Sequence, residues 1–381
     1  MTKPWDIIAG EYLPSSGGVA DYTRAVANAL AQRGEVIRVW QRGKEIVPQT
    51  DADGVLQYRC AGNFSGHGLE RIGRELNRLP GRRRLLIQYV PNAFGFKGMN
   101  VQFAKWVRNR AEIHKDDVRI MFHEVAYPWV RWPIKHNLIA AVNRWMAYSM
   151  IRHASKLYVS TTAWSDHLVR LGAVRDKIEL LAIPSNIPES EDKRIAQRLR
   201  RSLQPGKEDI VGHFGTYGKW VVESLKPIME ELLQRHANVQ ILLLGGGSSE
   251  FRTEIINAQP HLATRVTATG RIGSVDVADH ISACDVMVQP FPDGANTRRT
   301  SLMACLINGI ATVSNSGQST EPIWNETKAV ALAPSIIPGR FIEQITTLLG
   351  NESRRSALAK RGQNTYDLHF QLSRTIEKLM A

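Results

Sequence analysis

The chain has 381 residues, 43 % of them hydrophobic and 22 % charged, which is the composition of a globular protein long enough for two α/β domains. No apolar run approaches the roughly 18 residues of a membrane-spanning helix, and the first residues lack a signal-peptide pattern. The formal net charge of +13 is uneven, because residues 1–190 hold 27 Lys and Arg against 17 Asp and Glu, whereas residues 191–381 hold 22 against 19.

The basic first half indicates an anionic partner, although a basic face can also be simply solvated. The candidates are a phospholipid surface, a lipid-linked phosphate acceptor or nucleic acid. Nucleic acid is disfavoured, because the chain shows no helix-turn-helix, zinc or OB signature.

The cysteines and acidic motifs give no sign of a metal. Cys60, Cys284 and Cys305 are far apart and read as buried thiols, which predicts a cytoplasmic protein, with the inner face of a membrane as a further option. The sequence Asp51-Ala52-Asp53 has the letters of a metal-binding Asp-x-Asp, but it lies in a turn-like segment, and two nearby carboxylates alone make a poor metal site.

The first half of the chain alternates expected strands and helices. A strand at 6–9 leads through a loop with Gly17 and Gly18 into a helix at 19–33 and then a strand at 36–40. A strand, a glycine turn and a helix form the first unit of a doubly wound parallel sheet, in which ligands bind at the carboxyl ends of the strands. Glycines in that turn allow a ligand to approach the backbone.

The pattern continues to residue 190. Further strands are expected at 85–90, 118–122 and 156–160, and helices at 99–113, 139–153 and 161–171. Asn92, His123 and Glu124 follow two of these strands and are therefore placed at the ligand-binding edge. Two groups of side chains have open interpretations. Arg71, Arg74 and Arg78 share one helical face, which is either solvated or in contact with a membrane or phosphate acceptor, and loop 127–132 carries tryptophans that face an acceptor, a membrane or the core.

The second half repeats the organisation after a polar linker at 189–206. We expect an N-terminal domain at 1–190, a second domain at 206–362 and a final helix at 363–381. Within the second domain, strands are expected at 209–214, 239–244, 286–291 and 311–314, with helices from about 221 and at 277–283, 302–307 and 341–349.

Two turns of the second domain have the features of an anion site. Arg298, Thr300 and Ser301 stand where a strand and a polar turn lead into a helix, and Lys219 follows a glycine-rich turn at the start of another helix. Free N–H groups and the positive end of the helix dipole attract an anion at such a position, and the cations add charge. The alternative is an ordinary strand-to-helix connection with solvated cations.

The order of these motifs resembles that of the family-4 retaining glycosyltransferases of the GT-B fold. The matching positions are Gly17-Gly18, His123, Ile183 to Asn186, Lys219, Gly245 to Gly247, Asp293 and Glu321. The resemblance implies an α/β protein with two Rossmann-like doubly wound parallel-sheet domains facing a central cleft, with the last helix crossing back to the first domain. It also implies a metal-independent hexosyltransferase-type enzyme that moves a sugar, with retention, from a nucleotide-diphospho-sugar to a glycan, lipid-linked or small-molecule acceptor, as in bacterial-type polysaccharide or glycoconjugate biosynthesis.

The resemblance also implies roles for individual residues. The catalytic candidates are His123, Asp293 and Lys219. The candidates for the donor diphosphate are Gly17, Gly18, Lys219, Arg298, Thr300 and Ser301. The candidates for the nucleotide base and ribose are Arg271, Ile272 and Glu321, and those for the acceptor side are Glu124 and Asn92. No metal site and no cofactor other than the donor are expected.

Besides Ile187, which replaces a Gly after Asn186, the sequence departs from the family's pattern at two positions of the donor site. Ser301, in Ser301-Leu302-Met303-Ala304, replaces the Glu that usually holds the ribose, and Phe214 falls where an Arg usually binds the diphosphate. His213, the amides of the 215–216 turn and Arg298 are candidates to replace that Arg. Two alternatives therefore remain: a sugar-nucleotide or polyanion binder that has lost activity, and a sugar-nucleotide epimerase with His123 and Glu124 as its acid/base pair.

Overall fold

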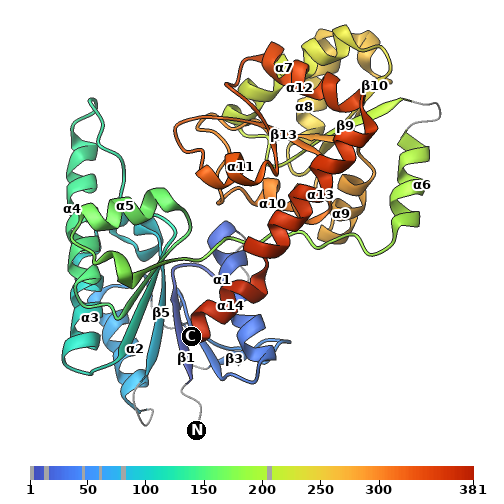
Figure 1. The fold of residues 1–381 in the computed structure, drawn as a ribbon. Coiled ribbons are helices and arrows are strands. Elements are labelled where there is room, and N and C mark those ends of the chain that lie inside the picture. The colour runs from blue at the N-terminus through green and yellow to red at the C-terminus, as the bar shows by residue number, and fades with distance from the viewer. Residues whose placement is uncertain (1–3, 13–16, 45–47, 60–61, 79–82, 204–207) are drawn as a thin grey trace. The chain divides into compact units, whose positions relative to one another are not determined.

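The structure is a computed structural model that describes residues 4–12, 17–44, 48–59, 62–78, 83–203 and 208–381. Its contacts divide the chain into two compact units, Met1–Ala182 with Leu372–Ala381, and Ile183–Gln371. Each unit is a mostly parallel sheet with helices packed on it (Figure 1). The predicted α/β fold with two parallel-sheet domains is confirmed.

The first unit is built on an eight-stranded sheet in the order β3-β4-β2-β1-β5-β6-β7-β8. Its strands are β1 (Trp5–Ala9), β2 (Ile37–Trp40), β3 (Gln49–Thr50), β4 (Leu56–Tyr58), β5 (Arg84–Tyr89), β6 (Asp117–Phe122), β7 (Lys156–Val159) and β8 (Ile178–Leu180). Among the strands of the described residues, only the short β3 pairs antiparallel, with β4. The other strands therefore end at one common edge, where the loops with Asn92 and His123 begin.

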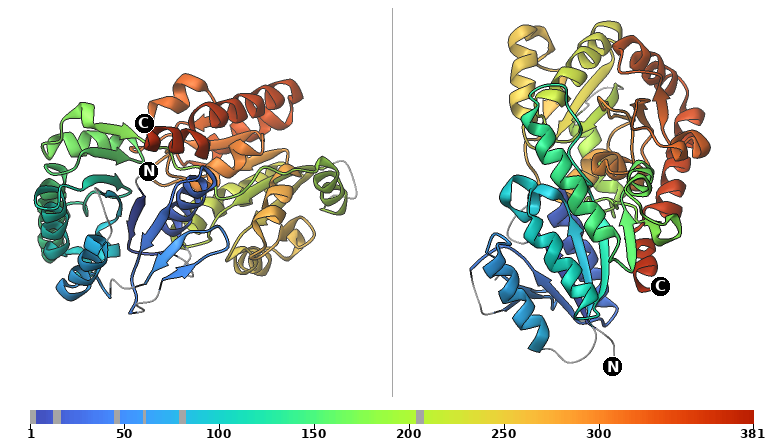
Figure 2. Two further views of the ribbon diagram at one scale, coloured as in Figure 1. Left: turned by 90° about the horizontal axis from the view of Figure 1, so that it is seen from below. Right: turned by 90° about the vertical axis from the view of Figure 1, so that its left-hand side faces the viewer.

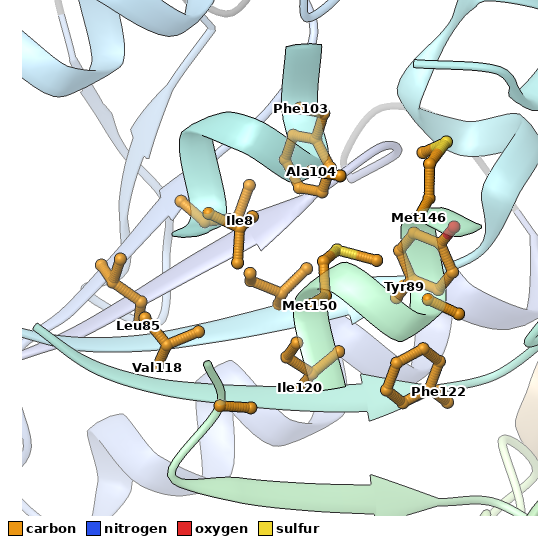
Figure 3. Packing of buried hydrophobic residues seen from close by; sticks show 14 of the residues in the cluster. Ile8, Leu85, Tyr89, Phe103, Ala104, Val118, Ile120, Phe122, Met146 and Met150 are labelled. Atoms are coloured by element: carbon orange, nitrogen blue, oxygen red, sulfur yellow. The ribbon is translucent and has the colours of Figure 1, made fainter. Parts of the chain in front are cut away.

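Helices cover both faces of this sheet. They are α1 (Gly18–Gln32), α2 (Gly66–Arg78), α3 (Val101–Glu112), α4 (Lys135–Ile151), α5 (Thr162–Arg170) and α14 (Leu372–Met380), with single turns η1 (Pro91–Phe94), η2 (Phe96–Gly98) and η3 (Arg175–Lys177). Helices α2 to α5 share one core cluster with strand residues such as Ile8, Leu85 and Ile120, and Figure 3 shows part of this cluster. Strands buried in this way need apolar residues on both sides, which explains their nearly continuous apolar sequences.

Helix α14 returns the end of the chain to the first unit, where it packs against α1. Ile376 and Leu379 are buried there, and Lys378 Nζ donates a 2.8 Å hydrogen bond to the carbonyl of Leu180. The sequence suggested one helix at 363–381, but the structure has two. Helix α13 ends at His369, and only the segment from Leu372 belongs to the first unit.

The second unit has a six-stranded parallel sheet in the order β11-β10-β9-β12-β13-β14. Its strands are β9 (Asp209–Phe214), β10 (Val239–Leu244), β11 (Val266–Ala268), β12 (Val286–Val288), β13 (Thr312–Asn315) and β14 (Ala331–Ala333). Its helices are α6 (Lys193–Leu203), α7 (Lys219–Arg235), α8 (Ser248–Ala258), α9 (Ser274–Ser282), α10 (Thr300–Ile307), α11 (Pro322–Thr327), α12 (Pro338–Leu349) and α13 (Glu352–His369), with the turn η4 (Pro260–Leu262).

Side chains of β9 and β10 alternate between two apolar clusters in the second unit. Val211 and Ile241 join the cluster with α7, α8 and α12, whereas Ile210 and Leu242 join the cluster with α9 and α10. Both faces of the sheet are thus covered, as in other doubly wound sheets. Gly212 lies where a Cβ atom would be only 2.6 Å from the Sγ of Cys284, so a side chain there would disturb the packing.

The predicted linker at 189–206 contains a helix, α6, whose only buried residue among those described is Ala196. The contacts divide the units earlier, between Ala182 and Ile183. Cys60, Arg82 and residues 204–207 lie outside the described residues. Cys284 and Cys305 are buried free thiols, and burial raises the pKa of Cys305 to about 12. None of the described helices is long and apolar enough to cross a membrane.

Candidate functional site

The candidate donor site lies at the topological switch point of the second sheet, where the order of the strands reverses. Strand β9 is the first of this unit, with β10 and β11 on one side and β12, β13 and β14 on the other. Connections leave β9 and β12 toward opposite sides of the sheet, and in such sheets ligands usually bind at this point, at the carboxyl ends of the strands. Helix α7 starts shortly after β9 and α10 shortly after β12, so two helix N-termini are placed at this edge.

Gln289 joins the two sides of this switch point. The residue follows β12 and is fully buried. Its Nε2 atom donates a 3.0 Å hydrogen bond to the carbonyl of Phe214, which ends β9, and its Oε1 atom accepts a 3.1 Å hydrogen bond from Ser301 Oγ in the first turn of α10. Ser301 therefore anchors α10 to β9 and β12.

Lys219 is the first residue of α7, and its side chain is exposed. Its Nζ atom lies 3.8 Å from Glu223 Oε1, one turn along the helix, which is a weak surface pair. Gly218 precedes the helix without a side-chain cap, and a Cβ atom there would meet no other atom within 4 Å. The start of α7 thus combines N–H groups, a lysine and open space, which together can hold an anionic group.

The loop between β12 and α10 carries the other predicted cations. Arg298 and Thr300 are half-buried, and Thr300 begins α10. Arg299 pairs with Asp293, and its guanidinium lies 4.7 Å from the centre of the Phe291 ring. The Nε atom of Arg299 is buried and has no hydrogen-bond partner among the described residues. Asp293 is therefore neutralised within the loop.

Glu321 is buried and holds the same loop from the start of α11. Its Oε2 atom accepts a 2.5 Å hydrogen bond from the backbone N–H of Thr297. A carboxylate that accepts a backbone N–H makes a strong charge-assisted bond. The structure therefore gives Glu321 a partner in this unit, and a direct contact with a ribose stays a prediction.

Three glycine-containing loops meet beside this site. Gly245 has φ +109°, and a Cβ atom there would lie 2.3 Å from the carbonyl oxygen of Gly215. The loops are also joined by hydrogen bonds from Tyr217 N to Gly246 O (3.2 Å) and from Gly245 N to Gly270 O (3.3 Å).

The predicted base contacts stand at the end of these loops. A Cβ atom on Gly246 would lie 3.4 Å from Arg271 Nη2, so the guanidinium lies over the glycine loop. Ile272 packs against the apolar cluster of α9 and α10.

His213 cannot replace the arginine that the resemblance calls for. Its ring is buried, and its Nδ1 atom lies 3.0 Å from the Tyr217 hydroxyl. Burial lowers the pKa of His213 to about 3, so the imidazole is neutral at physiological pH. The cations at this edge of the sheet are Lys219, Arg271, Arg298 and Arg299, of which Arg299 is paired with Asp293.

Gly17 and Gly18 lie at the carboxyl edge of the first sheet. Gly17 precedes α1 without a side-chain cap, and a Cβ atom on Gly18 would meet nothing within 4 Å. The described neighbours therefore leave space for a ligand at this helix start. Gly10, in contrast, is closely packed, because a Cβ atom there would lie 2.3 Å from Ala93 Cβ in the loop after β5. Residues 13–16 of the β1–α1 loop are not among those described.

His123 follows β6 at the same edge and is 5 % exposed. Its Nε2 atom lies 2.7 Å from Gln88 Oε1, and the edge of the Tyr22 ring packs against the imidazole with 5.0 Å between ring centres. Glu124 comes next and is half-buried, and Asn92 is exposed in η1. These contacts fix the orientation of the His123 ring.

The structure therefore gathers the predicted residues into two groups, one in each unit. Gly17, Gly18, Asn92, His123 and Glu124 lie at the carboxyl edge of the first sheet. Lys219, Arg271, Ile272, Asp293, Arg298, Thr300, Ser301 and Glu321 lie at the carboxyl edge of the second sheet. Among the residues that the structure describes, no group of three or more His, Cys, Asp or Glu could hold a metal ion; metal independence itself stays a prediction.

Sequence reasoning missed two features of this site. The sequence predicts a continuous strand at 286–291 and assigns Gln289 no role, although a polar residue inside an apolar run is a signal that it needs a partner. Trp220, which follows Lys219, is 72 % exposed. Its exposure had no sequence signal, because a tryptophan at a helix start is as often buried.

Comparisons with known proteins agree with this geometry. Residues 209–351 match the family model described as "Glycosyl transferases group 1". No curated protein matches the sequence.

Solved structures resemble the whole chain. The sucrose-phosphate synthase of Thermosynechococcus elongatus has 15 % sequence identity and a TM-score of 0.72, covering 100 % of this chain and 98 % of the other. A glycosyltransferase of Rickettsia africae has 12 % identity and a TM-score of 0.73, covering 100 % and 97 %. Anabaena HepE, solved in complex with UDP and glucose, has 13 % identity and a TM-score of 0.69, covering 100 % and 98 %.

At such identities a structural likeness establishes the fold, and the family model adds the domain. Residues 209–351 of the second unit match the glycosyl transferases group 1 model, and the chain as a whole has the two-domain GT-B fold of these solved structures, which is the fold that the resemblance in its sequence predicted.

Proposed function

We propose that the protein transfers a sugar, with retention and without a metal ion, from a nucleoside-diphosphate sugar to an acceptor hydroxyl. The observation that carries the proposal is the pair of helix starts at the switch point, α7 with Lys219 and α10 with Arg298 and Thr300. Breaking the sugar–phosphate bond builds negative charge on the diphosphate. Preorganised cations and N–H groups stabilise that charge in the transition state more than in the bound donor.

The nucleoside would lie along the glycine loops after β10 and β11. Arg271 lies over Gly246 and presents a planar cation, and Ile272 offers an apolar edge fixed by the cluster beneath it. HepE was solved with UDP, and another solved structure that resembles this chain is a trehalose-phosphate synthase described as UDP-forming. UDP-sugars are therefore the first donors to test.

The sugar would meet a loop held in one conformation. The pair of Asp293 and Arg299 fixes the turn after β12, so that Asp293 can accept hydrogen bonds from sugar hydroxyls with its charge balanced. In the first unit, the ring of His123 is held by Gln88, and its catalytic role stays a prediction. With retention, the leaving phosphate oxygen takes the acceptor's proton on the face from which it departs, so no separate base is required. The acceptor is a glycan, a lipid-linked molecule or a small molecule.

The test is a donor panel assayed for transfer to simple sugar acceptors and for slow hydrolysis, with EDTA present. The account expects turnover with one nucleotide class and a product whose anomeric configuration, read by proton NMR, equals that of the donor. Inversion would contradict retention, and turnover that returns only with Mg²⁺ or Mn²⁺ would contradict metal independence. Tight donor binding without turnover would favour the inactive binder, and a change of sugar configuration without transfer would favour the epimerase.

Lys219→Ala and Arg298→Ala test the site assignment. Each should lower kcat/KM for the donor by about 10²-fold, because each removes a preorganised charge from the leaving group. Arg235→Ala is the matched control, since Arg235 is an exposed cation at the other end of α7. Unchanged kinetics in both site variants would remove the diphosphate from this position.

A further inference from the structure

An exposed apolar surface runs along α4 and the loop before it in the first unit. We call it the α4 face, and its large apolar side chains are Trp129, Trp132, Ile134, Leu138, Trp145 and Tyr148. Trp132 is 81 % exposed, and Ile134 and Leu138 are 65 % and 64 % exposed. Single exposed apolar residues are ordinary, but a contiguous set marks an interaction site.

The positions on α4 follow one side of the helix. Leu138, Ala141, Trp145 and Tyr148 are spaced by three or four residues and are all exposed, whereas the opposite side buries Ala140, Met146 and Met150 in the core. Helix α4 is therefore apolar on both sides. One side packs in the core of the first unit, and the other side faces outward (Figure 1). The right-hand view of Figure 2 looks onto α3 and α4.

The loop that carries Trp129 and Trp132 is pinned in place by polar contacts. Asn137 brackets Val130, donating from Nδ2 to its carbonyl and accepting from its N–H, both at 2.9 Å. Arg144 donates a 2.9 Å hydrogen bond to the carbonyl of Tyr127, and its guanidinium lies 4.4 Å from the centre of the Trp129 ring. The fold thus holds these aromatic rings in solvent on a defined backbone.

The charge of this region determines which partner fits. Residues 125–165 contain no Asp or Glu, while Arg131, Lys135 and Arg152 are exposed on or beside the α4 face. Tryptophans beside cations, on a helix with an outward apolar side, have the chemistry of an interfacial helix that lies in the headgroup region of a bilayer. A second copy of this chain would bring the same cations together, which disfavours self-association through this face.

We propose that the α4 face docks on an anionic phospholipid surface, with Trp132 and Leu138 entering the interface and Arg131 and Lys135 contacting phosphate groups. The docking is independent of the transfer chemistry. A lipid-linked acceptor would, however, reach the first unit from this surface.

The test is cosedimentation of the full chain with vesicles of phosphatidylglycerol and phosphatidylcholine, compared with phosphatidylcholine alone. The wild-type protein should bind the anionic vesicles and lose affinity as salt rises. Leu138→Glu should weaken binding at least about tenfold, because the burial of a leucine side chain is lost. Arg131→Gln and Lys135→Gln should each weaken it by about fivefold. Ile337→Glu is the matched control, because Ile337 is 60 % exposed in the second unit and should leave binding unchanged.

Three results would overturn the proposal: equal binding to neutral and anionic vesicles, equal binding by wild type and Leu138→Glu, or no vesicle binding at all. In the last case, light scattering would show whether the wild-type chain forms a dimer that Leu138→Glu dissociates, which would assign the face to a second copy. Because the substituted side chains are exposed, far-ultraviolet circular dichroism should show an unchanged fold in every variant.

Discussion

Ser301 stands where the resembling family carries a ribose-binding Glu, and its surroundings show how this chain uses the position. Its hydroxyl donates to Gln289, and Gln289 in turn donates to the end of β9. Through Gln289, the residue therefore ties the first turn of α10 to the end of β9. The loop before α10 also carries Arg298 and Arg299, and Arg299 is paired with Asp293, so Arg298 is the cation of this loop that we propose for the diphosphate.

The sequence could place these residues but could not give their partners. Lys219, Arg298 and Thr300 were found because glycine turns and helix starts have local signals. The pairing of Asp293 with Arg299 and the bond from Thr297 to Glu321 depend on loop conformations that no short-range pattern records. The neutrality of His213 likewise follows from burial, which its neighbours in the sequence do not reveal.

His213 gives a prediction about stability and pH. Its pKa is lowered to about 3 in the folded state and returns to about 6.5 on unfolding, so the unfolded chain binds the extra proton between these values. Stability should therefore fall as the pH drops below about 6.5, by about 2 kcal/mol at pH 5 from this residue.

Urea unfolding of the second unit at pH 7.5 to 5 checks this. His213→Gln should flatten the decline, whereas His261→Gln, a change at an exposed histidine, should not. The same slope in wild type and His213→Gln would show that the buried ring does not carry the effect.

At the scale of elements, predictions worked best where a strand and its following helix had strong apolar patterns. The helix expected at 19–33 is α1 at Gly18–Gln32, and the strand expected at 118–122 is β6 at Asp117–Phe122. Helix α6 was missed because Ala196 is its only buried residue among those described, so apolar periodicity gave no signal. The break after α13 was missed because neither Gly nor Pro marks it.

The glycine loops offer a paired test at this scale. Gly245→Ala should destabilise the second unit by about 1–3 kcal/mol or more, because Gly245 has φ +109° and an alanine Cβ would collide with the carbonyl oxygen of Gly215. Gly218→Ala should change stability by no more than about 1 kcal/mol, since its space is open, yet it should weaken donor binding if the diphosphate lies at the start of α7.

Thermal unfolding and calorimetric titration with the donor nucleotide separate the two effects. A stable Gly218→Ala protein with undiminished affinity would argue that no ligand approaches this turn. A fully stable Gly245→Ala protein would contradict the close contact between the loops.

At the scale of the whole molecule, the resemblance to glycosyltransferases predicted the number and class of the domains, because it rests on motifs spread along the chain in order. The exact return of the chain to the first unit at Leu372 required the structure. Helix α14 packs on α1 and donates hydrogen bonds to the carbonyls of Leu180, at the end of β8, and Ala182, just after it, so it is part of the first unit's fold.

Ile376→Ala tests that role. The change should cost about 2–5 kcal/mol, because a fully buried side chain is removed from the packing of α14. Hydrogen–deuterium exchange should rise in α1 and α14 and stay unchanged in the second unit. Glu377→Ala, at an exposed position on the same helix, is the control. Faster exchange confined to the second unit would contradict the assignment of α14.

The central claim is that a nucleoside diphosphate binds at the switch point of the second sheet, at the starts of α7 and α10. The most direct test is a thermal-shift panel at low salt with UDP, GDP, ADP and their sugar conjugates, in the presence of EDTA. A ligand at 100 times its dissociation constant should stabilise the protein by about 2.7 kcal/mol. We expect one nucleotide class to stabilise the wild-type protein and Arg235→Ala but not Lys219→Ala or Arg298→Ala. If no nucleotide stabilises the wild-type protein, or if all four proteins respond alike, the claim is wrong.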